Sequence, residues 1–181
     1  DKAGYTDLIA SGGEWKLELD RHKDYLAGLG IETDVLHPAV WTNSEDEFFA
    51  KEYFEKHSLA AEKTIALFAG VRDPVRNYDK FGHALSSICK QSGYQIIALG
   101  SRKDYEKNQQ QLCQIGCQGH NLSGKLNLRQ TAAILRSCAL AVGSETGLAH
   151  IACAVETPNV VILGGGHFGR FMPYSELTTA V

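Results

Sequence analysis

The sequence predicts an α/β fold, specifically a Rossmann-like, doubly wound parallel sheet. Three observations carry this prediction. From residue 64 onward, short apolar runs of strand length recur along the chain, and several of them end in glycine. Segments with apolar residues at helical spacing lie between these runs, and the connections are short. Repeated βα units of this kind fold with right-handed crossovers into a parallel sheet that helices cover on both faces.

Five segments are predicted as strands. The first, TIALFAG, is a continuous apolar run that ends at Gly70, a pattern typical of a parallel strand buried on both faces. YQIIALG repeats this pattern and ends at Gly100, whereas HNLSG is shorter. The predicted strands lie within residues 64–70, 94–100, 120–124, 139–143 and 158–166.

Four helices are predicted between these strands, over residues 80–93, 101–116, 126–138 and 146–155. Gly93 and Gly116 close the first two, because glycine is the usual residue just after the end of a helix. The third has an amphipathic pattern. The residues that we expect on its core-facing side are Leu126, Leu128, Ala132, Ile134 and Leu135.

The first part of the chain follows a different pattern. ELDRHKDYLAGLGI predicts a helix that ends at Gly28 or Gly30. Ser44 is the predicted N-cap of a second helix, with acidic residues in the first turn that suit the helix dipole. Pro38 interrupts the segment between the two helices.

We interpret residues 1–60 as a connector with the end of a preceding domain, and residues 61–181 as the Rossmann-like domain. The chain starts with Asp1 rather than Met, and its last residues, ELTTAV, have the pattern of a strand that has just begun. We therefore expect it to be a fragment of a longer protein, cut short at the C-terminus.

The composition indicates an ordinary globular protein and argues against a nucleic-acid-binding or membrane-spanning one. The 181 residues are 44% hydrophobic and 22% charged, with a formal net charge of −3, as in ordinary globular proteins. No basic stripe indicates a nucleic-acid partner, and no apolar run approaches the roughly 20 residues that span a bilayer. We expect at most peripheral membrane contact.

The five cysteines do not predict disulfides or a metal site. Their odd number, in a chain with an ample core, argues against a disulfide framework. Cys113, Cys117 and His120 lie close together, but their spacing does not match a zinc ribbon or finger and no second ligand pair exists. We expect Cys138 and Cys153 to be small buried apolar residues.

The candidate site lies in the loops that follow the strands, because ligands of open parallel sheets bind beyond the carboxyl ends of the strands. These loops are AGVRDPVRN, GSRKD, GSETG and GGGHFGRF. The cationic side chains among them favour an anionic ligand, since guanidinium groups bind phosphate with two parallel hydrogen bonds. Alternatively, each arginine is solvated and pairs with Asp73 or Asp79. The cationic residues are Arg72, Arg76, His167 and Arg170.

The segment GSETG adds a second device for binding anions. If a helix begins at Thr146, the free N–H groups of its first turn point beyond the strand ends, and Gly147 lets a phosphate approach the backbone. His150 lies on the same side of this helix. The Glu145 carboxylate is repelled by phosphate, so sugar hydroxyls suit it better as partners. Alternatively it only complements the helix dipole, and the two roles are not exclusive.

Two segments resemble the family-9 glycosyltransferases, which include the lipopolysaccharide heptosyltransferases. LAVGSETGLAHIACAVETPNVVILGGG is similar to the family's Gly-x-Asp-Ser/Thr-Gly-x-x-His segment, small-residue helix and Thr-Pro-Val strand. ALFAGVRDPVRNYDKF resembles its strand, glycine loop and Lys-x-Trp-Pro element. The resemblance runs from about residue 64 to 174. This sequence departs from the family's pattern at four positions. The usual aspartate is replaced by Glu145, the lysine by Arg76, the tryptophan by Tyr78 and the proline by Asp79. These departures suggest a subgroup of the family that uses another nucleotide sugar.

The resemblance implies a GT-B architecture of two Rossmann-like domains, of which this chain is the C-terminal, donor-binding half. It implies inverting transfer of a sugar from an ADP-, UDP- or GDP-linked donor to a bacterial cell-surface polysaccharide or lipopolysaccharide, without a metal or cofactor. The catalytic base is expected outside this chain, so the fragment binds a nucleotide but transfers nothing alone.

The location expected from the resemblance is the cytoplasm or, peripherally, the inner face of the inner membrane. Two alternatives are a sugar-nucleotide epimerase of similar architecture and a non-catalytic nucleotide-binding module. The expected substrate-binding residues are Gly70, Arg72, Arg76, Ser101, Glu145, Thr146, Gly147, His150, His167 and Arg170. Within GSRKD, the expected ribose contact is Ser101 or, alternatively, Asp104.

Overall fold

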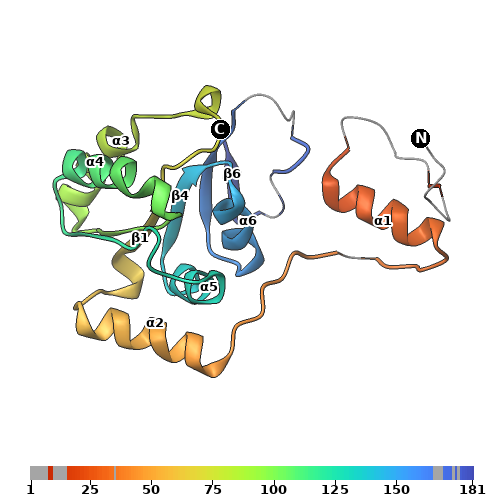
Figure 1. Cartoon of the computed structure of the whole chain (residues 1–181), viewed down its shortest axis with the longest axis horizontal. Helices are drawn as coiled ribbons and strands as arrows, with labels where there is room; N and C mark the ends of the chain where they lie inside the picture. Colours follow the sequence, from red (N-terminus) through yellow and green to blue (C-terminus); the bar gives the residue numbers. More distant parts are fainter. Residues whose placement is uncertain (1–7, 10–15, 35, 165–168, 173, 175) are drawn as a thin grey trace.

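A single six-stranded sheet organises the chain (Figure 1), in a computed structural model that describes residues 8–9, 16–34, 36–164, 169–172, 174 and 176–181. The strand order is β3-β2-β1-β4-β5-β6 and every neighbouring pair is parallel. This is the doubly wound order in which the chain reverses direction across the sheet between β1 and β4. The fold prediction is confirmed. The strands are β1 (Thr64–Phe68), β2 (Gln95–Ala98), β3 (Gly119–Asn121), β4 (Leu140–Ser144), β5 (Asn159–Ile162) and β6 (Thr178–Ala180).

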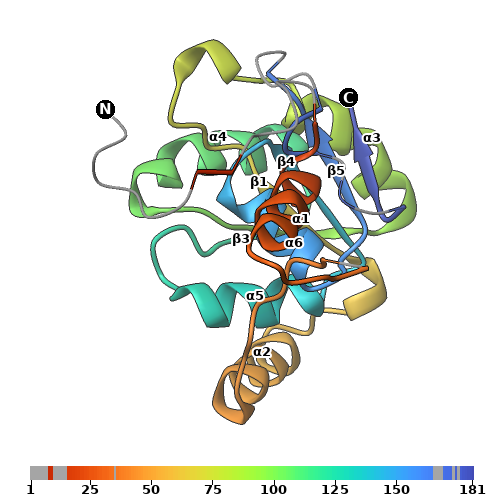
Figure 2. The same cartoon turned by 90° about the vertical axis from the view of Figure 1, so that its right-hand side faces the viewer.

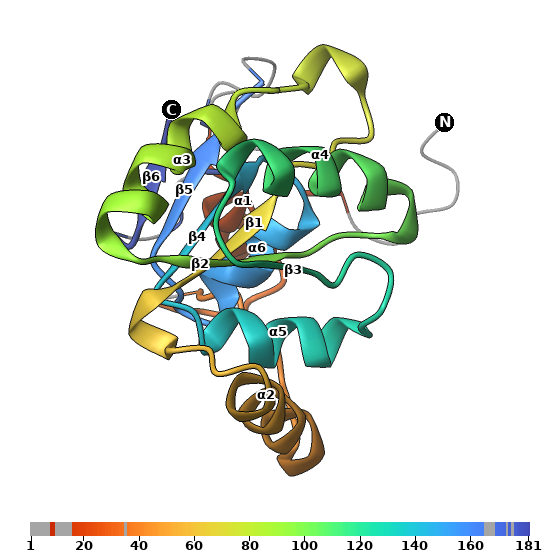
Figure 3. The same ribbon diagram turned by 90° about the vertical axis from the view of Figure 1, so that its left-hand side faces the viewer.

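Helices cover both faces of the sheet (Figure 3). On one face α3 and α4 pack against each other, and on the other α5 packs against α6. The helices are α1 (Glu18–Gly28), α2 (Ser44–Lys56), α3 (Phe81–Ser92), α4 (Tyr105–Ile115), α5 (Leu128–Arg136) and α6 (Gly147–Ala154). Short 3-10 turns are η1 (Ala61–Lys63), η2 (Pro74–Arg76) and η3 (Arg102–Asp104).

The central strand β1 supplies both cores because its side chains alternate between the two faces. Ile65 and Leu67 belong to the core under α3 and α4, whereas Ala66 and Phe68 belong to the core under α5 and α6. Gly143 on β4 is paired with Phe68, and a Cβ at Gly143 would lie 2.0 Å from the Phe68 ring. The absence of a side chain at Gly143 therefore makes room for the ring.

The predicted helix ends are confirmed where glycine determines them. Gly93 and Gly116 have φ values of +70° and +67°, and their N–H groups donate to the last turns of α3 and α4. The predicted N-cap of α2 is wrong by one residue. Asn43, not Ser44, caps the helix: its side chain accepts from the Asp46 N–H at 2.9 Å, and the Asp46 carboxylate accepts from the Asn43 N–H at 3.1 Å. This reciprocal capping box fixes the start of α2.

The two helices of the first sixty residues have different surroundings. α2 packs against α5 through Ala50 and Phe54, and an Asp46–Arg129 ion pair of 3.3 Å reinforces the contact. α1 has no buried residue and lies apart from the sheet, on the side of α6 (Figures 1 and 2). At its first residue, Glu18, the backbone N–H donates to the Arg170 carbonyl at 2.8 Å.

The other expectations concern cysteines, metals and membranes. All five cysteines are free, and Cys138 and Cys153 are buried, as predicted. Within the described ranges, no group of three or more His, Cys, Asp or Glu side chains could hold a metal ion. Within the same ranges, no helix combines the length and apolar character needed to cross a bilayer.

Candidate functional site

A cavity of about 1090 Å³ opens at the carboxyl edge of the sheet, and we refer to it as the edge cavity. Its walls come from the loops that follow β1, β2 and β3 and from the start of α6 after β4. It therefore lies where the strand order reverses between β1 and β4, the usual ligand site of a doubly wound sheet. Loops far apart in the sequence meet here because all the strands are parallel.

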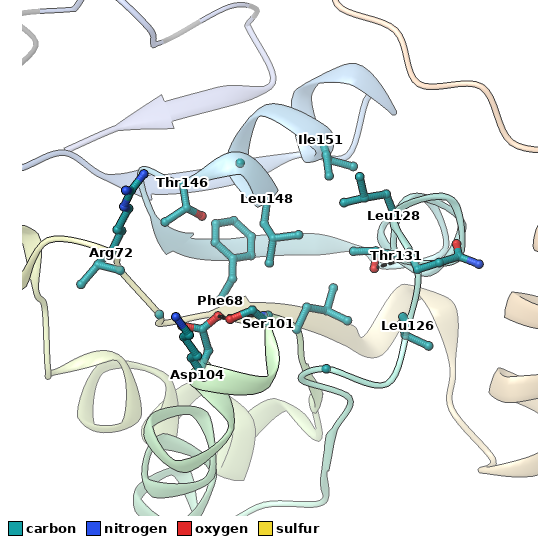
Figure 4. Close-up of a pocket in the computed structure, with 18 of the residues that line it drawn as sticks. Phe68, Arg72, Ser101, Asp104, Leu126, Leu128, Thr131, Thr146, Leu148 and Ile151 are labelled. Carbon is teal, nitrogen blue, oxygen red and sulfur yellow. Dashed lines mark hydrogen bonds between the residues drawn. The ribbon is translucent and has the colours of Figure 1, made fainter.

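The edge cavity has a polar and an apolar end (Figure 4). Arg72, Thr146, Ser101 and Asp104 lie toward one end. The apolar side chains of Leu126, Leu128 and Ile151 gather toward the other, with Thr131 beside them, and Leu148 lies between the two ends. The cavity therefore suits an elongated molecule with a charged part and an apolar or aromatic part.

The start of α6 forms one wall of the edge cavity. Thr146 is the N-cap in an extended conformation, and its side chain makes no capping hydrogen bond. The N–H groups of Ala149 and His150 both donate hydrogen bonds to the Thr146 carbonyl, at 3.0 and 3.4 Å. A Cβ at Gly147 would meet nothing within 4 Å. The first-turn N–H groups and the positive end of the helix dipole therefore face a space that an anion can enter.

Three cations line the edge cavity, Arg72, Arg76 and Lys103, and none of them forms an ion pair with another described residue. The carboxylates that the alternative reading assigned to the arginines have other partners. Asp79 pairs with Lys107 at 3.7 Å, and the Asp73 side chain accepts from the Val75 N–H. The described contacts thus leave both guanidinium groups available to a bound anion.

Gly164 and Gly70 make room for polar side chains at this wall. A Cβ at Gly164 would lie 2.5 Å from Arg76 Cγ, so the stem of Arg76 rests on that glycine. A Cβ at Gly70 would lie 2.1 Å from Asp104 Oδ1. The other carboxylate oxygen, Asp104 Oδ2, accepts from both the N–H and the hydroxyl of Ser101 at 2.7 Å. The Asp104 carboxylate is therefore fixed in the cavity wall.

Several predicted residues lie outside this lining. Glu145 is buried, 6% exposed, and its N–H donates to the Ile162 carbonyl. The His150 ring packs on Tyr174, with the ring centroids 5.4 Å apart. Burial lowers the pKa of His150, and the nearby Glu145 carboxylate opposes this only in part.

Arg170 also has a partner away from the edge cavity. Its Nε lies 2.6 Å from Glu18 Oε2, and this hydrogen bond lowers the pKa of Glu18 and raises that of Arg170. His167 lies outside the described residues. The predicted site residues that do line the cavity are Gly70, Arg72, Arg76, Ser101, Thr146 and Gly147.

The sequence prediction of Leu128 as a core residue is wrong. Leu128 is 70% exposed and lines the apolar end of the edge cavity, because α5 begins there and its first turn projects beyond the sheet. Asp104, the alternative to Ser101 as the expected ribose contact, lines the cavity together with Ser101, whereas Lys103 was missed as a site residue. The place of Lys103 in the loop directly after a predicted strand was the available signal.

Comparisons with known proteins bear on what enters this cavity. The sequence profile of the family described as "Glycosyltransferase family 9 (heptosyltransferase)" matches residues 18–181. The chain is 26% identical over 161 residues to Lipopolysaccharide heptosyltransferase 2 of Escherichia coli K12, an alignment that covers 83% of this chain and 46% of the relative. The chain spans about half the length of the curated relatives it matches.

Solved structures share the fold. A glycosyl transferase family 9 protein from Veillonella parvula superposes with a TM-score of 0.80 at 22% identity, covering 92% of this chain and 49% of that one. The E. coli ADP-heptose LPS heptosyltransferase II gives a TM-score of 0.75 at 23% identity, covering 96% and 56%. At these identities the likeness shows the fold alone.

The lowered pKa of His150 predicts a pH-dependent stability. The unfolded chain takes up a proton at this residue near pH ~6.5, whereas the folded chain takes it up only at lower pH. Stability should therefore be full above that pH and fall as the pH drops toward the lowered folded pKa. Urea unfolding at several pH values between 7.5 and 5 measures this decline in the free energy of unfolding. His150→Gln should show a smaller decline than the unsubstituted chain.

His83, which is exposed on α3, provides the control. His83→Gln should leave the decline unchanged. An equal decline in the unsubstituted chain and in His150→Gln would contradict the assignment, as would an NMR titration of the His150 imidazole at or above the ordinary value.

Proposed function

Because the chain belongs to glycosyltransferase family 9, the heptosyltransferase family, we propose that it is the donor-binding half of a two-domain, GT-B glycosyltransferase. The whole enzyme transfers a sugar, with inversion, from a nucleotide-sugar donor to lipopolysaccharide or a related cell-surface glycan. The observation that carries the proposal is the edge cavity, in which a helix start and cations without an ion-pair partner among the described residues face a space next to an apolar end.

The diphosphate of the donor lies at the start of α6 in this proposal. Backbone N–H groups at a helix N-terminus bind phosphate, and the helix dipole favours the negative charge. Arg72 and Arg76 approach from the loop after β1 and Lys103 from the loop after β2. When the bond between sugar and phosphate breaks, negative charge grows on the leaving diphosphate. Groups already held at this position stabilise that charge without reorganising.

The nucleoside extends toward the apolar end. Leu128, Leu148 and Ile151 offer an apolar surface to the flat base, and Ser101 with Asp104 offers polar groups to the ribose hydroxyls. We favour an ADP-linked donor over a UDP- or GDP-linked one because the E. coli relative of similar fold is named for ADP-heptose.

The sugar itself is proposed to contact Glu145, directly before the Thr146 N-cap. The carboxylate should avoid the diphosphate because like charges repel, and sugar hydroxyls are suitable donors to it. His150, His167 and Arg170 remain proposed contacts of the donor or of the bound acceptor. No metal or cofactor is needed for transfer in this proposal.

The second half of the enzyme supplies the catalytic base and most of the acceptor contacts. The support is the length of the relatives, since this chain covers 46% of one and 55% of another. The isolated chain therefore binds nucleotide but does not transfer sugar. We propose the cytoplasm, or the inner face of the inner membrane, as the place of action, because the matched relatives are named as lipopolysaccharide or lipooligosaccharide heptosyltransferases.

Nucleotide binding by the 181-residue chain tests the proposal. Calorimetry with ADP, UDP and GDP should detect binding, tightest for ADP. In Gly147→Leu, the new side chain projects into the edge cavity, so the ADP Kd should rise by at least about tenfold. The stability should stay unchanged or rise slightly, because leucine favours a helix more than glycine does. Well-folded chain that binds none of the three nucleotides would refute the proposal.

Glu145→Ala in the full-length protein tests the sugar contact. Loss of a carboxylate that contacts only the sugar should lower the rate of transfer by about 100-fold or more while the ADP Kd stays within about twofold. Glu156→Ala, at a residue exposed just beyond α6, is the control and should change neither quantity. Undiminished transfer by Glu145→Ala would limit Glu145 to a structural role.

A further inference from the structure

Asn108 contacts all three of the loops that follow β1, β2 and β3, although it does not line the edge cavity. It lies on α4 and is completely buried, with 0% of its surface exposed. Its Oδ1 accepts from the Ala69 N–H at 3.1 Å. Its Nδ2 donates to the Leu99 carbonyl at 2.9 Å and to the Ser123 hydroxyl at 2.8 Å. One side-chain amide therefore joins three separate segments of the chain.

The positions of these partners explain why an amide is needed. Ala69 and Leu99 are the first residues after β1 and β2, and Ser123 is the second after β3. All three are buried, with 0%, 1% and 3% exposed. The Leu99 N–H still donates to the Leu67 carbonyl, but the described backbone bonds include none to the Ala69 N–H or the Leu99 carbonyl. These two buried groups therefore need a partner from elsewhere. An N–H only donates and a carbonyl only accepts, so Ala69 and Leu99 together fix which end of the amide faces which loop.

Each loop that Asn108 holds carries groups of the edge cavity. The segment after Ala69 contains Arg72, and the segment after Leu99 contains Ser101 and Asp104. The segment after Ser123 continues into the apolar wall that ends at Leu128. Gly100 packs tightly between Asn108 and Asp104. A Cβ at Gly100 would lie 3.2 Å from Asn108 Nδ2 and 2.9 Å from Asp104 Cβ. A change in the amide is therefore transmitted directly to the cavity wall.

We propose that Asn108 is the positioning residue of the nucleotide site, which sets the spacing of the phosphate, ribose and base subsites by holding the three loops at one point. This inference rests on the proposed function, since it assigns the edge cavity to a nucleotide. Asn108 acts through the loops and not by touching the ligand, so its loss should misplace several contacts at once.

Gln111 provides a matched control on the same helix. It is also a buried amide, 3% exposed, and it stands one turn further along α4. Its Oε1 accepts from the Gly82 N–H at 2.7 Å and its Nε2 donates to the Asp79 carbonyl at 3.4 Å, which ties α4 to the start of α3. Loss of this amide leaves the buried Gly82 N–H without this partner, as loss of Asn108 does for the Ala69 N–H, and neither Gly82 nor Asp79 lines the edge cavity.

The test measures ADP binding by calorimetry and stability by urea unfolding in the 181-residue chain. Asn108→Ala and Gln111→Ala should both unfold at lower urea concentrations than the unsubstituted chain. Only Asn108→Ala should weaken ADP binding, by about tenfold in Kd. Asn108→Asp keeps an acceptor for the Ala69 N–H but loses the bond to Leu99, so its Kd should be intermediate. If Asn108→Ala does not fold, ADP binding by Asn108→Asp is compared with that of the unsubstituted chain instead.

Hydrogen exchange supplies a second readout. Amides of residues 69–76, 99–104 and 122–128 should exchange faster in either Asn108 variant, whereas Gln111→Ala should affect residues 77–83. ADP binding within twofold of the unsubstituted chain in folded Asn108 variants would overturn the proposal, and so would equal weakening by Gln111→Ala. If the unsubstituted chain binds no nucleotide, the proposed function itself fails, and this inference fails with it.

Discussion

The structure depends on how buried backbone groups find hydrogen-bond partners where the parallel strands end. Inside the sheet, each strand satisfies its neighbours, as in the pairing of Ala66 with Ile97. One or two residues further on, only part of the ladder continues, as where the Gly124 N–H donates to the Gly100 carbonyl at 2.8 Å. An unpaired buried polar group costs about 1–3 kcal/mol, so side chains have to replace the ladder bonds that are missing. Asn108 does this for three strand ends at once.

The same edge concentrates positive charge in a chain that is acidic overall. The formal net charge is −3, yet Arg72, Arg76 and Lys103 meet the start of α6 around one cavity. The fold produces this local field, because parallel strands bring the following loops to one side and a helix start adds its dipole there. Net charge argued against nucleic acid as the main partner, which stays a prediction, and it carried no information about this site.

The sequence predicted the repeating βα pattern and the glycine caps because these depend on residues close together in the chain. The core of α5 was predicted correctly for Ala132, Ile134 and Leu135. Leu128 was misplaced because an amphipathic pattern cannot show that the first turn of a helix extends past the sheet. Asn108 was missed within the polar segment YEKNQQQL, although Asn108, Gln111, Leu112 and Ile115 share the buried stripe of α4 at helical spacing. Their partners lie in other loops, which no local pattern identifies.

We propose that the edge cavity receives the nucleoside diphosphate of a sugar donor in a defined orientation. A crystal structure of the chain with ADP would show this orientation. We expect the diphosphate within hydrogen-bond distance of the first-turn N–H groups of α6 and of Arg72 or Arg76, with the adenine against Leu128 and Ile151. A diphosphate bound away from the start of α6, or ADP bound outside the edge cavity, would refute the proposal.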